Sequence, residues 1–362
     1  MDRPIVACVL AGGIGSRLYP ASRSDRPKQF LAFGGEQSLL SRTLDRTAFA
    51  DERYVLTREE FADEIREHAP EAGALVEPAG RDTGPALVYA AWRLRDRFDA
   101  EPVLCCLPSD HHVADDAAFA TRLERAAEVA VETDGLVTLG VEPTRPATGY
   151  GYIVPESDGT EPAGVETALE AGDDGLGADD YAAVDRFTEK PDREDAEHVI
   201  EGGAYWNAGI FAWTPSALLR EARDSPLAPL VDALEDGEPG RGFDAVDAVS
   251  VDYAIMERAS DVFVTPLSVG WDDLGTWDAV GRVLAADDGA GGDESANATV
   301  AGDTLSIDAE HNVVAAPDAR VSLLEVDDLI VAAFDDRILV APRGASQRVR
   351  TIVDRLRERD AF

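Results

Sequence analysis

Two cations flank a glycine-rich stretch near the start of the chain. Residues 5–11 are apolar and lead directly into AGGIG, and Arg17 and Lys28 follow. An apolar run that stops at a glycine turn is typical of a buried strand, and glycine lets the backbone approach a ligand closely. Backbone N–H groups in such a loop attract anions, and a fixed cation completes a phosphate site. An ordinary glycine turn is the alternative, because the stretch is neither a Walker A loop nor GxGxxG.

Carboxylates follow two further apolar runs. Asp110 comes after the run at 102–107, and the pair Asp272 and Asp273 comes after the run at 262–266. A carboxylate just past a central strand of an α/β sheet lies where ligands bind, and oxygen donors suit Mg²⁺. His111 and His112 could suggest zinc, but neighbours on extended chain point to opposite faces, so the two cannot share one ion. We therefore predict magnesium at Asp110, with a loop cap as the alternative.

Two other stretches have patterns that ligand sites use. The turn-rich segment 77–85 opens a helix predicted over 86–97, so it is either a second ligand site or a capped helix only. Asn207 and Gly209 interrupt the aromatic run 205–213. A polar residue and a glycine inside an apolar strand indicate close approach of a ligand, and a β-bulge is the alternative.

Lysine is almost absent from the chain. Only Lys28 and Lys190 occur among 33 basic residues, and both lie beside proline, in PKQF and EKPD. A compact ammonium has few substitutes where a point charge meets a phosphate. This scarcity favours a phosphate-binding role for both lysines over the alternative that these two lysines are present by chance.

The composition describes a large folded protein with an acidic surface. The 362 residues are 45% hydrophobic, and 71 acidic against 33 basic residues give a net charge of −38. This charge argues against nucleic acid and anionic membranes as partners and is a feature that halophilic proteins use. The three cysteines lack metal or disulfide spacing, and no apolar run is long enough to span a membrane. With no leader pattern either, we expect a reduced, salt-rich cytoplasm.

The acidic surface predicts a dependence of stability on salt. Charges of one sign repel each other, and the repulsion is screened over about 10 Å at 0.1 M ionic strength. We expect the protein to unfold at low ionic strength and to refold when salt is added. Circular dichroism during dialysis from high to low salt measures this, and a folded protein at low salt would contradict it.

Strands and helices alternate through the first 141 residues. This alternation predicts a doubly wound, mostly parallel α/β sheet of the Rossmann-like kind. Predicted strands cover 53–57, 75–76, 102–107 and 136–141, and predicted helices cover 38–49, 61–69, 86–97 and 118–133.

The pattern changes beyond residue 148. The aromatic alternation at 148–154 predicts antiparallel structure, and 156–180 is an acidic, glycine-rich surface insertion. Further strands are predicted at 183–188, 205–213 and 262–266, and helices at 192–201, 217–222, 227–234 and 252–259. We predict a catalytic domain over 1–285, a linker over 286–297, and a small β domain or short β-helix with a terminal helix over 298–362.

Eight blocks in order resemble the mannose-1-phosphate guanylyltransferases, a branch of the sugar-1-phosphate nucleotidyltransferases. They are LAGGIGSRLYP…PKQF, EPAGRDTGPA, LPSDHHV, TGYGYI, FTEKPD, WNAGIFAW, SVDYAIMERA and GWDDLGTW. PKQF, EPAGRDT and SVDYAIME favour the guanylyl branch over the glucose-1-phosphate enzymes. The departures are Asp82 and Gly84 for Asn and Ala, Ser109 for Ala, and Asp272 where Ser is common. That last departure makes Asp273 the better match to the metal-binding acid. The chain is also expected to lack the cupin-like isomerase domain of longer relatives.

The resemblance implies that GMP passes from GTP to α-D-mannose 1-phosphate, giving GDP-mannose and pyrophosphate. Arg17 and Lys28 would be catalytic, and Asp110 and Asp273 would hold Mg²⁺. The implied nucleotide-binding residues are Leu10, Ala11, Gly12, Gly13, Gly15, Glu77, Pro78, Gly80, Arg81, Thr83 and Ser109. The implied sugar-phosphate residues are Gly149, Glu189, Lys190 and Asn207. The C-terminal β domain contains no cluster that resembles a catalytic site, so we expect it to serve in stacking or in forming a homodimer.

Two alternatives stay open at this point. One is another nucleotidyltransferase that uses UTP or dTTP with glucose 1-phosphate. The other is a catalytically silent nucleotide-sugar sensor, against which the retention of Arg17, Lys28, Asp110 and Asp273 argues.

Overall fold

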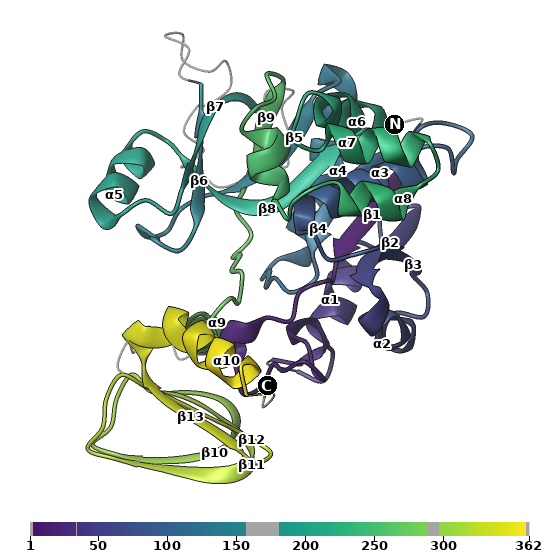
Figure 1. Cartoon of the computed structure of the whole chain (residues 1–362). Coiled ribbons are helices and arrows are strands. Elements are labelled where there is room, and N and C mark those ends of the chain that lie inside the picture. The colour runs from purple at the N-terminus through teal and green to yellow at the C-terminus, as the bar shows by residue number, and fades with distance from the viewer. Residues whose placement is uncertain (1–2, 34, 157–180, 288–296, 360–361) are drawn as a thin grey trace. The chain divides into compact units, whose positions relative to one another are not determined.

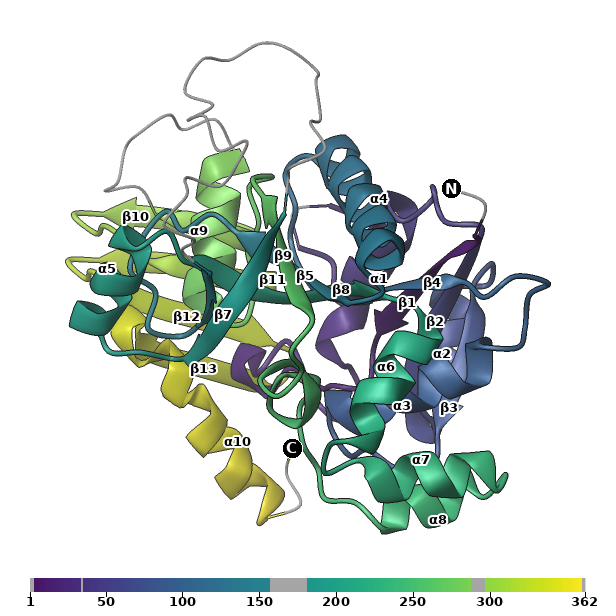
Figure 2. The ribbon, with the colours of Figure 1, turned by 90° about the horizontal axis from the view of Figure 1, so that it is seen from above.

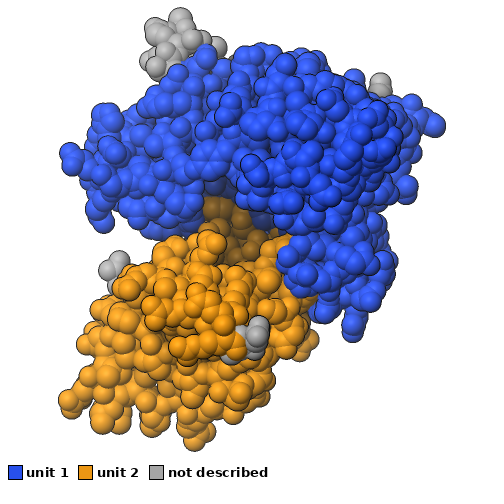
Figure 3. Space-filling model, viewed as in Figure 1, with its two compact units in different colours: residues 1–10, 46–108, 114–269 blue, residues 11–45, 109–113, 270–362 orange. Residues whose placement is uncertain are grey.

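The computed structural model describes residues 3–33, 35–156, 181–287, 297–359 and 362. Residues 157–180 of the predicted insertion and 288–296 of the predicted linker lie outside them. By their contacts the residues form two compact units, coloured separately in Figure 3. Unit 1 holds residues 1–10, 46–108 and 114–269, and unit 2 holds residues 11–45, 109–113 and 270–362.

Unit 1 is built on a nine-stranded sheet with the order β3-β2-β1-β4-β8-β5-β9-β7-β6. The strands β1 to β4 pair in parallel, as do β5 and β9, whereas β8 and β7 run against the others. This confirms the predicted mostly parallel sheet. The strands are β1 (Ile5–Leu10), β2 (Glu52–Arg58), β3 (Gly73–Glu77), β4 (Val103–Pro108), β5 (Leu136–Val141), β6 (Gly151–Pro155), β7 (Ala182–Glu189), β8 (Tyr205–Trp213) and β9 (Val262–Leu267).

Helices cover both faces of this sheet. Figure 2 shows α4 on one face of β1, β4 and β8, with α3 and α6 on the other. The helices of unit 1 are α2 (Ala62–His68), α3 (Thr83–Leu94), α4 (Asp116–Thr133), α5 (Arg193–Glu201), α6 (Pro215–Arg223), α7 (Ala228–Glu235) and α8 (Pro239–Asp244), with the short turn η3 (Glu59–Phe61) and the π-helix η4 (Asp252–Met256).

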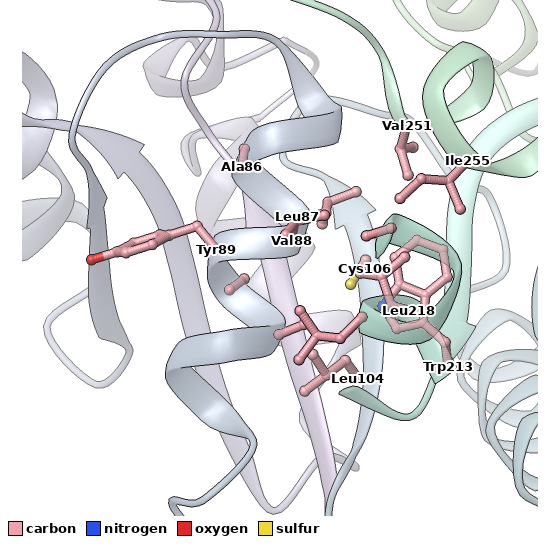
Figure 4. Close-up of a cluster of buried hydrophobic side chains, with 14 of the residues drawn as sticks. Ala86, Leu87, Val88, Tyr89, Leu104, Cys106, Trp213, Leu218, Val251 and Ile255 are labelled. Atoms are coloured by element: carbon pink, nitrogen blue, oxygen red, sulfur yellow. The ribbon is translucent and has the colours of Figure 1, made fainter. Parts of the chain in front are cut away.

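The strand β4 shows why this sequence is buried on both sides. Leu104 and Cys106 point toward α3 and α6, where they join Leu87 and Leu218 in the main core (Figure 4). Cys105 points to the other face and contacts the backbone of α4. A strand covered by helices on both faces must be apolar at every position, which accounts for the unbroken run PVLCCL.

The chain passes from unit 1 to unit 2 directly after three strands that run in the same direction. The glycine-rich stretch follows β1, residues 109–113 follow β4, and residues from 270 onward follow β9. All three crossings therefore start at carboxyl ends of strands, where α/β sheets place their ligands.

Unit 2 combines these segments with the C-terminal region. Its second sheet has the order β10-β11-β12-β13, in which β10, β11 and β12 are parallel and β13 is antiparallel to β12. Figure 1 shows α9 and α10 beside this sheet. The elements are α1 (Leu39–Arg46), α9 (Trp277–Asp287), β10 (Ala298–Ile307), β11 (Val313–Leu324), β12 (Leu329–Phe334), β13 (Arg337–Pro342) and α10 (Val349–Arg357), with the short 3₁₀ turns η1 (Ser16–Leu18), η2 (Lys28–Phe30) and η5 (Arg343–Arg348).

Most elements lie where the sequence predicts them, with a few exceptions. The helix α3 begins at Thr83 rather than at 86, because the Asp82 side chain caps it by accepting from the Thr83 N–H. The helix predicted over 252–259 is a single π-turn, η4. The helices α8 and α9 are not predicted, since α8 contains two glycines and is only six residues long. None of the described helices is long and apolar enough to cross a bilayer.

Candidate functional site

Lys28 lies at the centre of a polar cluster within unit 2. Its side chain is buried, with an exposed fraction of 4%, and its Nζ lies 2.7 Å from Oδ2 of Asp110. The same Nζ donates to the backbone carbonyl of Asp273 at 2.8 Å. One lysine thus contacts the residues that follow β4 and those that follow β9. The structure therefore brings together Lys28, Asp110 and Asp273, which were singled out from separate motifs.

The glycine-rich loop is folded against PKQF. Gly15 has φ +73°, and a Cβ at this position would lie 2.4 Å from the Cβ of Lys28. Glycine is thus needed at position 15 both for its conformation and for space. The Lys28 N–H donates to the Ile14 carbonyl at 3.0 Å, and Gln29 Nε2 donates to the Ala11 carbonyl at 3.2 Å. These bonds fix the position of the ammonium relative to the loop.

Asp110 stays ionised despite its surroundings. Desolvation acts to raise the pKa of its carboxyl, but the charges of Lys28, His111 and Arg17 outweigh it and hold the pKa below the ordinary value. His111 is in turn held by Trp271, whose Nε1 donates to Nδ1 of the imidazole at 3.1 Å. This hydrogen bond restricts the orientation of the His111 imidazole.

The two adjacent acids after β9 differ in their surroundings. Asp272 is buried, accepts from the Leu274 N–H through Oδ1 and pairs through Oδ2 with Arg282 at 2.6 Å. Its backbone also pairs with that of His112 in a β-bridge. Asp273 Oδ1 accepts from the Gly275 N–H at 2.9 Å. Both oxygens of Asp272 therefore serve the packing of unit 2, which favours Asp273 as the ligand-binding acid.

The donors at this cluster suit a magnesium ion. Asp110 and Asp273 supply hard carboxylate oxygens, and Lys28 contacts both residues. Among the described residues, no three His, Cys, Asp or Glu side chains gather into a metal cage. Mg²⁺ commonly binds through one or two carboxylates and completes its shell with water and substrate phosphate. The carboxylates of Asp110 and Asp273 are ligands of the kind that such a site uses.

A second group of predicted residues lies in unit 1, where β3 leads into α3. Glu77 ends β3 with an exposed fraction of 8%, and its Oε2 is buried with no hydrogen-bond partner among the described residues. Burial raises the pKa of Glu77 to about 7; Arg58 counteracts part of this effect, and Asp82 adds to it. Glu77 thus changes charge near neutral pH.

The raised pKa of Glu77 predicts a pH-dependent loss of stability. The folded state keeps a proton that the unfolded state releases above about 4.5, so stability is fully present below that pH and falls until about pH 7. Glu77→Gln removes this effect. We expect the thermal midpoint of the variant, relative to that of the wild type, to increase between pH 5 and 7. Above pH 8 this difference in midpoint should stay constant, with all measurements at the same salt concentration. Glu67→Gln, at an exposed position, is the matched control. A difference in thermal midpoint between Glu77→Gln and the wild type that does not change with pH would contradict the assignment.

The start of α3 is bonded to the segment before η4. The Gly84 N–H donates to the Val249 carbonyl at 3.0 Å, and the Val251 N–H donates to Oγ1 of Thr83 at 3.0 Å. A Cβ on Gly84 would lie 2.7 Å from the Val249 carbonyl oxygen. This close approach explains why glycine stands where the resemblance leads one to expect alanine. Val251 and Ile255 pack against α3 in the core (Figure 4).

A third group in unit 1 surrounds Gly151. This residue pairs with Glu189 across β6 and β7. A Cβ on Gly151 would lie 2.8 Å from Oε2 of Glu189 and 3.6 Å from the Cβ of Asn207. Lys190 has φ +44° and forms an ion pair with Glu189. A strained backbone next to converging polar groups is typical of a binding site.

Asp252 belongs to this third group and carries no role in the sequence prediction. The Asn207 amide donates to its Oδ1 at 2.7 Å, and Oδ1 of Asn207 accepts from the Gly209 N–H. Burial raises the pKa of Asp252, and the nearby carboxylates of Glu189 and Asp82 raise it further, against the hydrogen bond from Asn207. Its motif, SVDYAIMERA, is part of the family resemblance, but the sequence assigns no role to its residues. π-Turns such as η4 often occur at functional sites.

The predicted residues thus fall into the two units as separate groups. Unit 2 holds Ala11, Gly12, Gly13, Gly15, Arg17, Lys28, Ser109, Asp110 and Asp273, and unit 1 holds Leu10, Glu77, Pro78, Gly80, Arg81, Thr83, Gly149, Glu189, Lys190 and Asn207 (Figure 3). Ser109 is buried, and its carbonyl accepts from Oγ1 of Thr43 at 3.2 Å. Sequence reasoning missed Gly151, the second glycine of TGYG, and Asp252.

Comparison with known proteins identifies the family to which this chain is similar. The model of the nucleotidyl transferase family matches residues 6–288, and that of the MannoseP isomerase/GMP-like beta-helix domain matches residues 302–356. The chain is 35% identical to the xanthan biosynthesis protein XanB of Xanthomonas campestris, over 98% of this chain and 73% of that protein. It is 33% identical to the mannose-1-phosphate guanylyltransferase of Escherichia coli K12, over 96% and 73% respectively.

A solved structure agrees with these relatives over the whole fold. The crystal structure of a protein named mannose-1-phosphate geranyltransferase, from Thermus thermophilus, has a TM-score of 0.84 and 32% identity, and the match covers 98% of this chain and 99% of that one. The four-stranded C-terminal sheet corresponds to the β-helix domain that the second family model describes. With a nucleotidyl transferase match over most of its length and guanylyltransferases among its relatives, this chain belongs to the nucleotidyl transferase family.

Proposed function

We propose that this enzyme transfers GMP from GTP to α-D-mannose 1-phosphate and releases pyrophosphate. The observation that carries the proposal is the cluster of Lys28, Asp110 and Asp273 against the glycine-rich loop. It combines a buried ammonium, two acids and a backbone N–H loop, which are the parts that phosphoryl-type transfer uses. Relatives named mannose-1-phosphate guanylyltransferase support the choice of GTP and mannose.

The proposed reaction is an in-line displacement at the α-phosphorus of GTP. A phosphate oxygen of mannose 1-phosphate forms the new bond to this phosphorus, and the bond to the bridging oxygen of pyrophosphate breaks. The attacking phosphate is already anionic at neutral pH, so the enzyme needs no general base. Its task is to position two anions and to neutralise the charge that develops between them.

The cluster residues of unit 2, together with Leu10 at the end of β1, have the following roles in this proposal. Residues 10–15 bind the triphosphate through backbone N–H groups, and Arg17 adds a cation. Lys28 stabilises the α-phosphate as charge builds on it. Asp110 and Asp273 would hold Mg²⁺, which supplies further charge neutralisation when bound. The Lys28 ammonium and the Asp110 carboxylate are paired with each other, and this pairing helps to keep the carboxylate ionised and holds both groups in place.

The residues of unit 1 are proposed to bind the remaining parts of the substrates. Glu77, Pro78, Gly80, Arg81 and Thr83 line the guanosine site. Gly149, Glu189 and Asn207 bind mannose hydroxyls, and Lys190 binds the sugar phosphate. We add Gly151 and Asp252, because one leaves room between Glu189 and Asn207 and the other bonds to the Asn207 amide.

A substrate panel tests the proposal. Purified protein in high salt with Mg²⁺ is given GTP, ATP, UTP and dTTP, each with mannose 1-phosphate and with glucose 1-phosphate, and pyrophosphate release is measured. We expect GTP with mannose 1-phosphate to be the preferred pair. Preference for UTP or dTTP with glucose 1-phosphate would overturn the assignment, and binding of GDP-mannose without turnover of any pair would make the protein a sensor.

We further propose a homodimer formed through the C-terminal β domain, in a reduced, salt-rich cytoplasm. Its sheet exposes large apolar side chains, which is unexpected on a chain of net charge −38. These are Leu305, Ile307, Leu324, Ile338 and Val340. Light scattering in high salt gives the oligomeric state, and a monomer would contradict the dimer.

The three cysteines are free, buried thiols, in keeping with a reducing compartment.

A further inference from the structure

The turn η1, which contains Arg17, contacts the C-terminal end of the chain. Nη1 of Arg17 donates to Oε1 of Gln347, in η5, at 2.9 Å. Both residues belong to unit 2 and are 330 positions apart in the sequence. The hydrogen bond therefore joins the residue proposed to bind the triphosphate to the part of the chain that follows the C-terminal sheet.

The backbone beside Arg17 is fixed by the same region. Leu18 and Tyr19 are buried in a cluster with Val349 and Val353 of α10. Nε1 of Trp277 donates to the Tyr19 carbonyl at 2.9 Å. The C-terminal region thus holds the main chain that carries Arg17 as well as its guanidinium.

The charge of the partner distinguishes Arg17 from the next arginines along the loop. Arg23 pairs with Asp335, in the turn after β12, at 2.5 Å, and Arg26 lies 3.5 Å from the same carboxylate. Those two guanidinium groups are neutralised by a carboxylate, whereas Arg17 is held by a neutral amide oxygen. The chain has 71 acidic residues and only three glutamines, so an uncharged acceptor here is unexpected from composition.

A neutral acceptor suits a guanidinium that must bind an anion. Arginine presents its donors in one rigid plane, so a single hydrogen bond restricts the direction in which the others point. A carboxylate would orient the group equally well but would cancel its charge and repel a phosphate. The Arg17 charge also acts on Asp110, whose pKa it helps to lower, so it reaches the Lys28 cluster.

We propose that Gln347 is a positioning residue: its amide oxygen orients the Arg17 guanidinium for the nucleotide triphosphate without neutralising it. The C-terminal region is then part of the nucleotide site of unit 2. The proposal rests on the proposed function only in that Arg17 binds the triphosphate. It does not depend on which base or sugar the enzyme selects.

A double-mutant cycle tests the proposal with the full chain in high salt. Gln347→Leu removes the acceptor at similar size, and we expect the KM for the nucleotide to rise about 3–10-fold, the range for one hydrogen bond, with kcat changed less. In an Arg17→Ala background the same substitution should change KM less than twofold, because the group it orients is absent. An equal effect in both backgrounds, or none in the wild type, would overturn the proposal.

Two further variants separate orientation from packing. Gln347→Glu keeps the hydrogen bond but adds a negative charge, so we expect it to raise KM more than Gln347→Leu does; wild-type KM would overturn the charge argument. Gln37→Leu is the matched control, since Gln37 is also exposed but bonds to Asp45, and it should leave KM unchanged. A rise in KM as large as that of Gln347→Leu would show a general effect of the substitution and overturn the proposal.

Failure of this proposal is distinguishable from failure of the proposed function. The cycle is run with whichever nucleotide and sugar phosphate the wild type prefers. If the wild type prefers UTP, the cycle therefore still tests the role of Gln347. Calorimetric binding of inorganic tripolyphosphate gives a second readout that needs neither base nor sugar. We expect its affinity to fall in Gln347→Leu, and an unchanged affinity would count against the proposal.

Discussion

Lys28→Met should lower kcat by about 10³-fold while the protein stays folded. The loss reflects removal of a preorganised cation from the place where charge develops on the α-phosphate. Methionine is chosen because the Lys28 side chain is buried, so its bulk must be kept. Steady-state pyrophosphate release with saturating substrates and Mg²⁺ measures the effect. Turnover within a few fold of the wild type would remove Lys28 from its assigned role.

Loss of the ion pair must be separated from loss of catalysis. Lys28→Met leaves the Asp110 carboxylate without its partner. We expect the free energy of unfolding to fall by about 1–3 kcal/mol, a loss between those typical of exposed and of buried ion pairs. The double variant Lys28→Met with Asp110→Asn removes both charges, so stability should return while activity does not. Recovery of activity together with stability would show that Lys28 acts only through folding.

Asp110→Asn and Asp273→Asn should each raise the Mg²⁺ concentration needed for half-maximal activity by at least about tenfold. Loss of a supporting group already costs metal sites 10–100-fold in affinity, so loss of a direct ligand should cost no less. A titration of activity against Mg²⁺ measures the shift. Electron paramagnetic resonance of free Mn²⁺ measures ion binding to the protein without turnover and should show the same loss.

Asp272→Asn is the matched control, because Asp272 is the adjacent acid in the same segment. Its carboxylate pairs with Arg282 at 2.6 Å and accepts from the Leu274 N–H. We expect a lower thermal midpoint from the broken ion pair and an unchanged Mg²⁺ requirement. If Asp272→Asn shifted the Mg²⁺ requirement and Asp273→Asn did not, the roles of the two acids would have to be exchanged.

Local patterns were sufficient to predict most of the sheet. The strands β5 and β8 begin and end where the apolar runs do, since β5 is buried at every position and β8 is buried at its last four positions. The prediction was less accurate at η4, where helical residues make only a π-turn. The segment before it is held by a hydrogen bond from the Gly84 N–H and by one to Oγ1 of Thr83, two residues that lie more than 160 positions earlier. Contacts between distant residues decide such a segment, and no local pattern contains them.

The chemistry proposed for the candidate site rests on residue types that can be identified in the sequence. A glycine loop, two isolated lysines and acids after apolar runs indicate phosphate and magnesium wherever they fold. Their grouping was not predictable from spacing. Gly151, Asp252 and Gln347 became candidates only because the fold brings them to Glu189, Asn207 and Arg17.

By itself, the sequence determined the fold class, the family resemblance and the acidic surface, because these depend on periodicity, motif order and composition. The family resemblance favours Asp273 over Asp272 as the metal ligand, and only the tertiary structure supplies a physical reason for that preference. Arg282 and a backbone N–H engage both oxygens of Asp272. The tertiary structure also brings the turn after the glycine-rich loop into contact with the far end of the chain. Side chains hundreds of residues apart can share a hydrogen bond only after folding brings them together, as it does Arg17 and Gln347.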